Sequence, residues 1–494
     1  MIFRHGVAKL ALLGSVLVAL AATGAGVQRA LPVTPEIDEP VFVQPAVRIA
    51  ATGNLDPGWF GHPGATVIYP LAAFYRLAGS DVERRFAQQP QDFYLAGRWL
   101  GVAYQVLAIP LVFAVGRIAF GATAGVIGAW LTAILPIAVA HAQIVRTDSA
   151  AIFFGLLGLW LMLRAFDQPT RIRLAIAGMS VGLAVATRYF MVALVPIALL
   201  TARRRAPLTL AAVAGGFLAM SPFALLDLPA LRTSLLAEAE SSHVGADGLS
   251  PFGNLGWYVS SSLPDDLTWP VAALAAAGVG LSLWRRSPRQ LLLVVFVAVY
   301  VVGISTSALH WHRWTIQVLP LLALFAGYAL QNVPSLPAAA LGTLVASVQL
   351  AAQLVLFDLQ QLQPSPRVLA RAWLVEHSSP RTGIVSEWYG PPLEGTRLNN
   401  RVRFSLSEQR LDSYAGYVVA SSAVYDRYFA EPTRYVRQVE FYEELFGRGQ
   451  LQAEFHARVP GEEVLRALGG AECNCSLHPT RGAPSLRIYA VGPT

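Results

Sequence analysis

Glu36-Ile37-Asp38-Glu39-Pro40 places three carboxylates within four residues, after one long apolar segment and before a region of many more. Carboxylates are costly to place in hydrocarbon, so this loop is expected in water or in a hydrated cleft at a membrane surface. A carboxylate held there can take a proton from an attacking hydroxyl group, which makes Asp38 and Glu39 candidates for a catalytic base. The simpler alternative, compatible with the first, is that one of them caps a helix beginning at Pro40.

The composition predicts an integral membrane protein. Of 494 residues, 54% are hydrophobic and only 14% are charged, and the mean hydropathy is +0.49. Such a chain has too little polar surface to cover a water-soluble globule of its size. The net charge of +7 does not indicate nucleic-acid binding, because most arginines fall in short loops between apolar segments, where they set membrane topology.

About eleven transmembrane helices are expected from the apolar segments, together with one shorter interfacial helix over residues 65–77. The expected spans are residues 10–27, 93–118, 124–139, 150–163, 174–187, 190–201, 208–226, 269–284, 291–309, 314–330 and 338–357.

Arginine-rich turns set the expected orientation of these spans. Basic clusters are retained on the cytoplasmic side, so the turns at Arg117, 164–173, 203–205, 285–289 and 331–337 are assigned to it, as is the N-terminus. Arg188 then marks the outer tip of a hairpin. An odd number of spans that starts inside ends outside, so the carboxylate loop and the C-terminal region are expected to be extracytoplasmic.

The apolar spans stop near residue 358, and charged residues, tyrosines and turns follow. We therefore expect a transmembrane domain over residues 1–358 and a small extracytoplasmic α/β domain over 359–494. Helices are predicted at residues 369–377 and 436–446, and strands at 383–387, 417–420, 451–457 and 485–491.

The arginine-rich cytoplasmic turns do not account for every ionisable group. The remaining groups lie on the expected outer side. Bland alternatives exist: Arg146 and Asp148 could simply pair with each other, and His310 and His312 could belong to an aromatic belt with an interfacial arginine. An arginine deep in a span needs an anionic partner, so such residues are candidate phosphate ligands or carboxylate partners. The candidates for substrate binding are His62, Arg98, His141, Arg146, Asp148, Arg188, His310, His312 and Arg313.

No cofactor is predicted, and metal dependence is left open. Two histidines separated by one residue, without a clear third ligand, are a weak metal signal. Cys473 and Cys475 are also separated by one residue and are interpreted as incidental.

The ordered series of motifs resembles the GT-C superfamily of membrane glycosyltransferases, in particular the bacterial family 39 type, which is similar to protein O-mannosyltransferases and lipid A aminoarabinose transferases. The resemblance covers essentially the whole chain. Its motifs are Asp38-Glu39, Gly61-His62-Pro63, Arg98, Arg146-Thr147-Asp148, the stretch from Gly182 to Tyr189, and the stretch from His312 to Leu322. Related enzymes often carry lysine before paired prolines where this chain has His62 and a single proline.

The resemblance implies a hexosyl- or pentosyltransferase in the inner membrane of a bacterial cell. It would move a sugar from a polyprenyl-phosphate carrier to a hydroxyl group of a lipid, glycan or protein acceptor, with inversion. Asp38 would be the base, Glu39 would shape its surroundings, Asp148 would hold the acceptor or orient an arginine, and the basic residues would neutralise the leaving phosphate. The alternatives are a membrane transporter, which should show charges near the mid-bilayer, and a lipid-linked polysaccharide polymerase or ligase.

Overall fold

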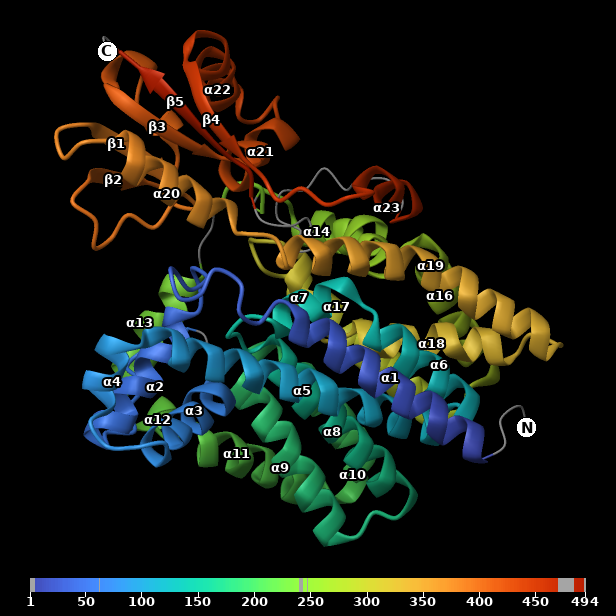
Figure 1. The fold of residues 1–494 in the computed structure, drawn as a ribbon. Coiled ribbons are helices and arrows are strands. Elements are labelled where there is room, and N and C mark those ends of the chain that lie inside the picture. The colour runs from blue at the N-terminus through green and yellow to red at the C-terminus, as the bar shows by residue number, and fades with distance from the viewer. Residues whose placement is uncertain (1–4, 62, 240–242, 247, 470–483, 493–494) are drawn as a thin grey trace.

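The computed structural model describes residues 5–61, 63–239, 243–246, 248–469 and 484–492. A bundle of helices makes up most of the chain, and a small domain built on a sheet lies at one end of the bundle (Figure 1). The first described residues lie in the bundle and the last ones lie in the sheet domain (Figure 1). The predicted fold class, a helical membrane domain followed by a small C-terminal α/β domain, is confirmed.

Twelve helices of the bundle coincide with most of the predicted spans within the described residues. They are α1 (His5–Ala25), α5 (Pro90–Ala119), α6 (Ala122–Ala133), α7 (Pro136–Ala142), α8 (Asp148–Asp167), α9 (Arg171–Thr187), α10 (Val195–Ala202), α11 (Ala206–Met220), α16 (Trp269–Arg285), α17 (Pro288–Ser305), α18 (Leu319–Gln331) and α19 (Leu336–Gln361). Within the described residues, five helices are long and apolar enough to cross a membrane, or up to seven if each bent pair counts as one span. The count of about eleven therefore stays a prediction.

Some expected spans are broken. The segment predicted at 124–139 divides into α6 and α7, which meet at 59°. Pro136 begins α7, and proline cannot continue the hydrogen-bond ladder of a preceding helix. The segment predicted at 190–201 begins with a 3₁₀ turn, η1 (Tyr189–Leu194), before α10. A short 3₁₀ turn, η2 (Arg203–Arg205), then leads into α11.

The turns assigned to the cytoplasmic side lie together at one end of the bundle. Arg289 pairs with Asp167 at 2.7 Å, and the Arg205 guanidinium donates to the carbonyl of Pro169. Gln290 and Gln331 donate to the backbone carbonyls of the turn after α5, at 3.2 and 2.9 Å. The predicted grouping of these turns is confirmed, while the side of the membrane that they face stays a prediction.

Glycine allows close approach where α9 meets α11. A side-chain carbon added at Gly182 would lie 2.1 Å from the Val213 carbonyl oxygen, and one at Gly216 would lie 2.3 Å from that of Met179. Small residues at such crossings bring helix backbones together in a membrane, where packing replaces the hydrophobic effect as the force between helices. Glycines within the predicted spans thus serve helix packing.

Short helices cover the sheet-domain end and one side of the bundle. The helices α2 (Pro40–Thr52), α3 (Ala65–Leu77) and α4 (Val82–Gln88) share a separate apolar core with the first half of α5. The helix predicted at 65–77 is confirmed with those bounds. The segment 227–267, where no span was predicted, contains short helices. They are α13 (Leu228–Glu238), α14 (Pro251–Trp257), the π-helical turn η3 (Tyr258–Ser262) and α15 (Leu263–Leu267), preceded by α12 (Phe223–Leu226).

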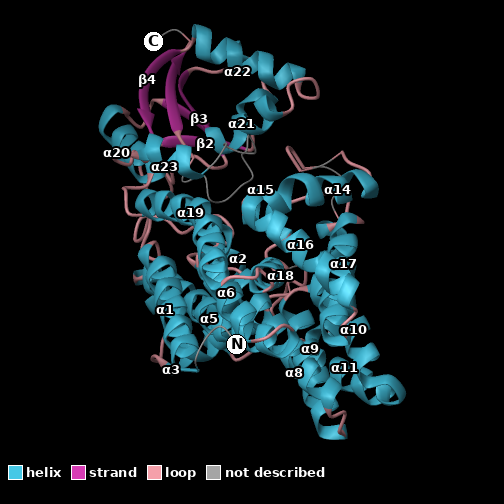
Figure 2. Cartoon of the chain, turned by 90° about the vertical axis from the view of Figure 1, so that its right-hand side faces the viewer, coloured by secondary structure: helices cyan, strands magenta, loops and turns pink. Residues whose placement is uncertain are grey.

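The C-terminal domain is a five-stranded mixed sheet flanked by helices, reached from α19 through α20 (Pro366–His377) (Figure 2). The strand order is β2-β1-β3-β5-β4; β1 is parallel to β2 and β3, and β5 is antiparallel to β3 and β4. The elements are β1 (Gly383–Glu387), β2 (Asn399–Arg403), β3 (Gly416–Ser421), α21 (Ser422–Ala430), α22 (Val436–Arg448), β4 (Gln450–Phe455), α23 (Glu462–Gly469) and β5 (Leu486–Val491). The four predicted strands are all present, and β2 was missed because this edge strand is largely polar.

Candidate active site

Asp38 lies between two arginines that come from distant parts of the chain. Arg146 Nη1 is 2.9 Å and Arg313 Nη1 is 3.6 Å from Asp38 Oδ2. Asp38 precedes α2, Arg146 lies between α7 and α8, and Arg313 lies in the 3₁₀ turn η4 (His312–Trp314) that precedes α18. The Asp38 side chain is 48% exposed, so a solute can reach this carboxylate while the arginines hold it in place.

Asp148 contacts Arg146 and helps to orient it. Arg146 Nε lies 3.6 Å from Asp148 Oδ2, and Arg188 forms an ion pair with the other oxygen of the same carboxylate. Gln317 donates a further hydrogen bond to Asp148 at 3.4 Å. Asp148 is only 1% exposed, and a buried carboxylate is tolerated when cations and donors satisfy it in this way. The predicted pairing of Arg146 with Asp148 therefore exists within a larger network.

Glu39 is separated from Asp38 by its surroundings. Its carboxylate makes a two-point ion pair with Arg98, at 2.7 and 2.8 Å, and both side chains are buried. The backbone N–H groups of Glu36 and Val145 also donate to this carboxylate, at 2.8 and 2.9 Å. Glu39 makes no side-chain cap for α2. The oxygens of Glu39 are therefore occupied by structural contacts, whereas the Asp38 carboxylate is partly exposed.

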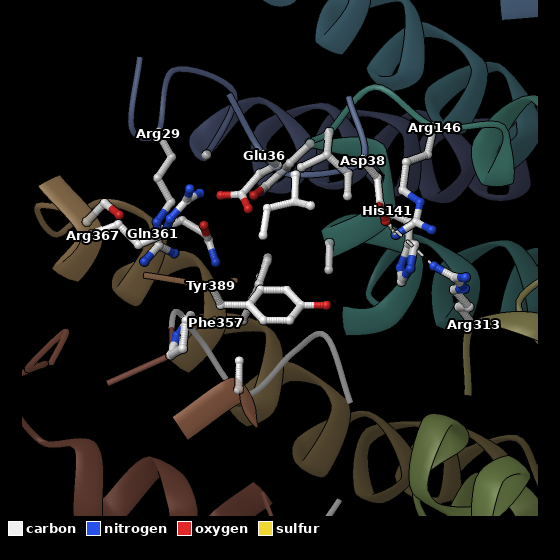
Figure 3. A pocket seen from close by; sticks show the side chains of 18 of the residues that line it. Arg29, Glu36, Asp38, His141, Arg146, Arg313, Phe357, Gln361, Arg367 and Tyr389 are labelled. Carbon is white, nitrogen blue, oxygen red and sulfur yellow. Dashed lines mark ion pairs between the residues drawn. The ribbon is translucent and has the colours of Figure 1, made fainter. Parts of the chain in front are cut away.

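A cavity of about 280 Å³ opens where the helical bundle meets the sheet domain. Figure 3 shows Asp38, His141, Arg146 and Arg313 at one end of it. The His141 ring is buried and its Nδ1 donates to the Ile137 carbonyl at 2.9 Å, which fixes the direction of the ring. The lining residues are Gly26, Arg29, Glu36, Ile37, Asp38, Arg98, Ala140, His141, Gln143, Ile144, Arg146, Trp311, Arg313, Phe357, Gln361, Ser365, Arg367, Tyr389, Ala423, Arg427 and Pro484.

The structure does not bring every candidate residue to this cavity. His310 and His312 are buried against the Trp257 ring, at centroid distances of 4.5 and 4.8 Å, and do not line the cavity. His312 Nδ1 lies 3.4 Å from Asp266 Oδ1. The contacts with Trp257 and Asp266 join the loop at 310–314 to α14 and α15, so the two histidines anchor the loop that also carries Arg313.

Two further predictions fall on residues that the structure does not describe. His62, a candidate for substrate binding, lies outside the described residues, as do Cys473 and Cys475. Among the described residues, no group of three or more His, Cys, Asp or Glu side chains is placed to hold a metal ion.

Comparisons with known proteins identify the architecture. Residues 85–226 match the model of the dolichyl-phosphate-mannose-protein mannosyltransferase family. The chain is similar along its whole length to ArnT from Cupriavidus metallidurans bound to undecaprenyl phosphate, with a TM-score of 0.51, 13% identity and 100% of each chain covered. This chain has the GT-C fold.

The same fold is found in a second type of enzyme. The oligosaccharyltransferase AglB from Archaeoglobus fulgidus, in complex with an inhibitory peptide and a dolichol-phosphate, is similar with a TM-score of 0.52 and 15% identity. That alignment covers 90% of this chain and 72% of AglB. A comparison with curated proteins finds no match. The GT-C fold and the apolar helices together make this a multi-pass membrane protein.

The cavity between the bundle and the sheet domain is also lined by side chains that the sequence analysis did not identify. Arg29 lies in the turn after α1, while Arg367, Tyr389 and Arg427 come from the sheet domain. No short motif marks these residues, because they meet only when the C-terminal domain lies against the bundle. A signal was present for Arg29, which directly follows an apolar span.

The charges of the Asp38 end favour an anionic ligand. Asp38, Arg146, Asp148, Arg188 and Arg313 together carry one net positive charge. Burial lowers the pKa of Arg313 to about 10, and the charge of Arg146 contributes in the same direction, but the group remains a cation near neutral pH. Burial opposes the charged form of Arg146, yet the carboxylates of Asp38 and Asp148 raise its pKa overall. Two fixed guanidinium groups beside one accessible carboxylate suit a phosphate ligand.

Proposed function

We propose that the protein is a glycosyltransferase that moves a sugar from a polyprenyl-phosphate carrier to an acceptor hydroxyl group, with inversion at the anomeric carbon. The observation that carries the proposal is the contact of Asp38 with Arg146 and Arg313 at an open cavity, at 2.9 and 3.6 Å. This arrangement combines a candidate base with cations for a leaving phosphate, which are the two elements that such a displacement needs.

Asp38 would accept the proton of the acceptor hydroxyl as its oxygen bonds to the anomeric carbon. The bond from that carbon to the phosphate oxygen breaks, and the electron pair leaves with the polyprenyl phosphate. Arg146 and Arg313 would stabilise the anion that leaves. Both arginines pair with Asp38. A phosphate that draws them away from Asp38 would raise the basicity of this carboxylate, so donor binding would activate the base.

The known partners of similar structures support a lipid-linked donor. ArnT is bound to undecaprenyl phosphate, and AglB is bound to a dolichol-phosphate. A long isoprenoid chain stays in the bilayer because each buried methylene contributes about 0.8 kcal/mol. An enzyme that uses such a donor must therefore present its site at the membrane. The acceptor would be a lipid, a glycan or a protein.

The proposal includes an orientation and a domain division. Arginine-rich turns grouped at one end of the bundle favour that end as cytoplasmic. The cavity and the sheet domain would then lie outside the cytoplasm, at the inner membrane of a bacterial cell. We place the domain boundary at residues 358 and 359, within the last turn of α19.

Mass spectrometry of lipids, glycans and envelope proteins, from cells that express the wild type or a variant, tests this function. Asp38→Asn should remove the glycosylated product. Asp167→Asn is the matched control, because it breaks another partly exposed carboxylate–arginine pair far from the cavity. If cells with Asp38→Asn make as much product as wild-type cells, Asp38 is not the base.

A further inference from the structure

Three further arginines line the cavity: Arg29 and Arg367 lie at the end away from Asp38 (Figure 3), and Arg427 lies beside Tyr389. Arg29 belongs to the membrane domain, whereas Arg367 lies at the start of α20 and Arg427 lies on α21. The two domains therefore build this end of the cavity together.

Two of these three arginines are buried, and all three are only partly satisfied by hydrogen bonds. Arg427 is 4% exposed and Arg367 is 9% exposed. One nitrogen of Arg427 donates to the Tyr389 hydroxyl at 3.2 Å, and Arg367 Nε donates to the Gly390 carbonyl at 2.9 Å. Among the described residues, Arg427 Nε and Nη1, Arg367 Nη1 and Arg29 Nη2 have no hydrogen-bond partner.

Glu36 lies near Arg29 and Glu387 lies near Arg427, but no carboxylate of the described residues forms a hydrogen bond with the vacant donors of these arginines, which leaves room for a further anion. Each guanidinium loses its hydration when it is buried, and neutral partners such as a hydroxyl or a carbonyl return only part of that free energy. A phosphate group fits the vacant donors, because guanidinium nitrogens bind its oxygens in pairs. Burial also lowers the pKa of Arg29, although the charge of Glu36 opposes this effect.

The topology of the sheet supports a ligand at the same place. Strand β1 lies between its parallel neighbours β2 and β3. The chain continues from β1 to β2 toward one edge of the sheet, and from β3 to β4 toward the other edge, so the direction of the connections reverses between β1 and β3. Ligands of open α/β sheets bind at such a switch point. Tyr389 follows β1 and Ala423 follows β3, and both line the cavity. Ala423 lies in the first turn of α21, so the positive end of this helix also faces the cavity.

We propose that Arg29, Arg367 and Arg427 bind a phosphate group of the acceptor, so that the C-terminal domain selects a phosphorylated acceptor. This assignment rests on the proposed function. The leaving phosphate of the donor must lie beside the reacting carbon, near Asp38 and its two arginine partners. An anion at the opposite end of the cavity is therefore a second group, which the acceptor must supply.

Isothermal titration of the full chain in lipid nanodiscs tests this subsite, with inorganic phosphate as the probe and polyprenyl phosphate present at saturation. The carrier occupies the Asp38 end, so the remaining phosphate binding reports the second end. The wild type should bind, and the double variant Arg367→Gln with Arg427→Gln should bind roughly tenfold more weakly or not at all, through loss of charge-assisted hydrogen bonds.

The control removes the same charge from exposed positions of the same domain, in the double variant Arg397→Gln with Arg437→Gln. This control should bind phosphate as the wild type does. Arg29→Gln is a second test, because Arg29 belongs to the other domain. This variant should also weaken phosphate binding, and it keeps the proposal testable if the sheet-domain variant does not fold. The proposal is overturned if the wild type does not bind, if polyprenyl phosphate abolishes its binding, or if the arginine variants bind normally.

Titration measures binding without turnover, so its result is separate from the test of sugar transfer. If the wild type binds phosphate through these arginines but transfers no sugar, only the proposed function is contradicted. The source of the phosphate is separated by two further probes. Glucose 1-phosphate represents a soluble phosphorylated sugar, and phosphatidic acid in the nanodisc represents a lipid headgroup; the better competitor of inorganic phosphate identifies the class.

Discussion

Glu39 and Arg98 form a buried, two-point ion pair, with Glu39 Oε1 2.7 Å from Arg98 Nε and Glu39 Oε2 2.8 Å from Arg98 Nη2. Arg98 also donates to the backbone carbonyls of Val27 and Arg29, at 2.8 and 2.9 Å. This pair therefore fixes the carboxylate loop and the turn after α1 against the middle of the bundle. Asp38 stands next to Glu39 in the chain, and its position depends on this contact.

Removing one partner of the pair should destabilise the protein strongly. Glu39→Gln leaves Arg98 buried without a countercharge, and such changes cost about 3–5 kcal/mol. Thermal unfolding of the purified protein in detergent should show a lower midpoint, while Asp167→Asn, which breaks an exposed pair, should change stability by less than about 1 kcal/mol. A double replacement, Glu39→Leu with Arg98→Met, should be milder than Glu39→Gln. Equal midpoints for wild type and Glu39→Gln would show that the pair does not hold the loop.

Arg313 should act on the donor phosphate. Arg313→Gln removes one guanidinium beside Asp38, so we expect the KM for the polyprenyl-phosphate donor to rise roughly tenfold, the loss of one charge-assisted interaction. Arg313→Lys should restore only part of the affinity, because lysine keeps the charge but not the planar pair of donors. Initial rates at varied donor concentration measure this effect. A normal donor KM in Arg313→Gln, with an altered KM for the acceptor, would reverse our assignment of the two ends.

Stability should depend on pH through Glu387, in the sheet domain. Burial raises the pKa of this carboxyl from 4.5 to about 7, although hydrogen bonds from Tyr442 and from the Ser421 backbone oppose the shift. The folded state then binds the proton more tightly than the unfolded state. This contribution is fully present below pH 4.5 and is lost as pH rises through about 7, by up to about 3 kcal/mol.

Thermal unfolding at a series of pH values between these limits measures the dependence on Glu387. The variant Glu387→Gln cannot titrate, so its curve should lack this slope even if its stability is lower throughout. The same slope in the variant and the wild type would assign the pH dependence to another group.

The orientation of the chain gives a further prediction. With the arginine-rich turns retained inside, alkaline phosphatase fused after Thr494 should be active, because that enzyme folds only outside the cytoplasm. A fusion within the turn at 203–205 should be inactive and serves as the internal control. Activity of the second fusion alone would place the cavity on the cytoplasmic side.

Much of the fold follows from the sequence, because long apolar segments and arginine-rich turns are strong local signals. Helix α3 and strand β1 have the predicted bounds. The break at Pro136 was missed because the apolar run continues across it. In the site, Asp38, Arg146 and Arg313 were identified from the sequence, since each carries a charge beside an apolar span.

Other parts of the site depend on contacts that no local pattern contains. Glu39 and Asp38 are adjacent and chemically similar, and only the fold shows that one is buried against Arg98 while the other faces the cavity. Arg367 and Arg427 were not predicted, because they reach the cavity through the docking of a separate domain. His312 was predicted to bind substrate, and the structure places its ring against Trp257, outside the lining of the cavity.

An electron cryomicroscopy structure of the full chain in lipid nanodiscs with polyprenyl phosphate tests the central claim most directly. The phosphate should appear between Arg146 and Arg313, within hydrogen-bond distance of both, and Asp38 should have lost at least one of its two arginine contacts. A phosphate bound away from both arginines, with the Asp38 contacts unchanged, would contradict the account.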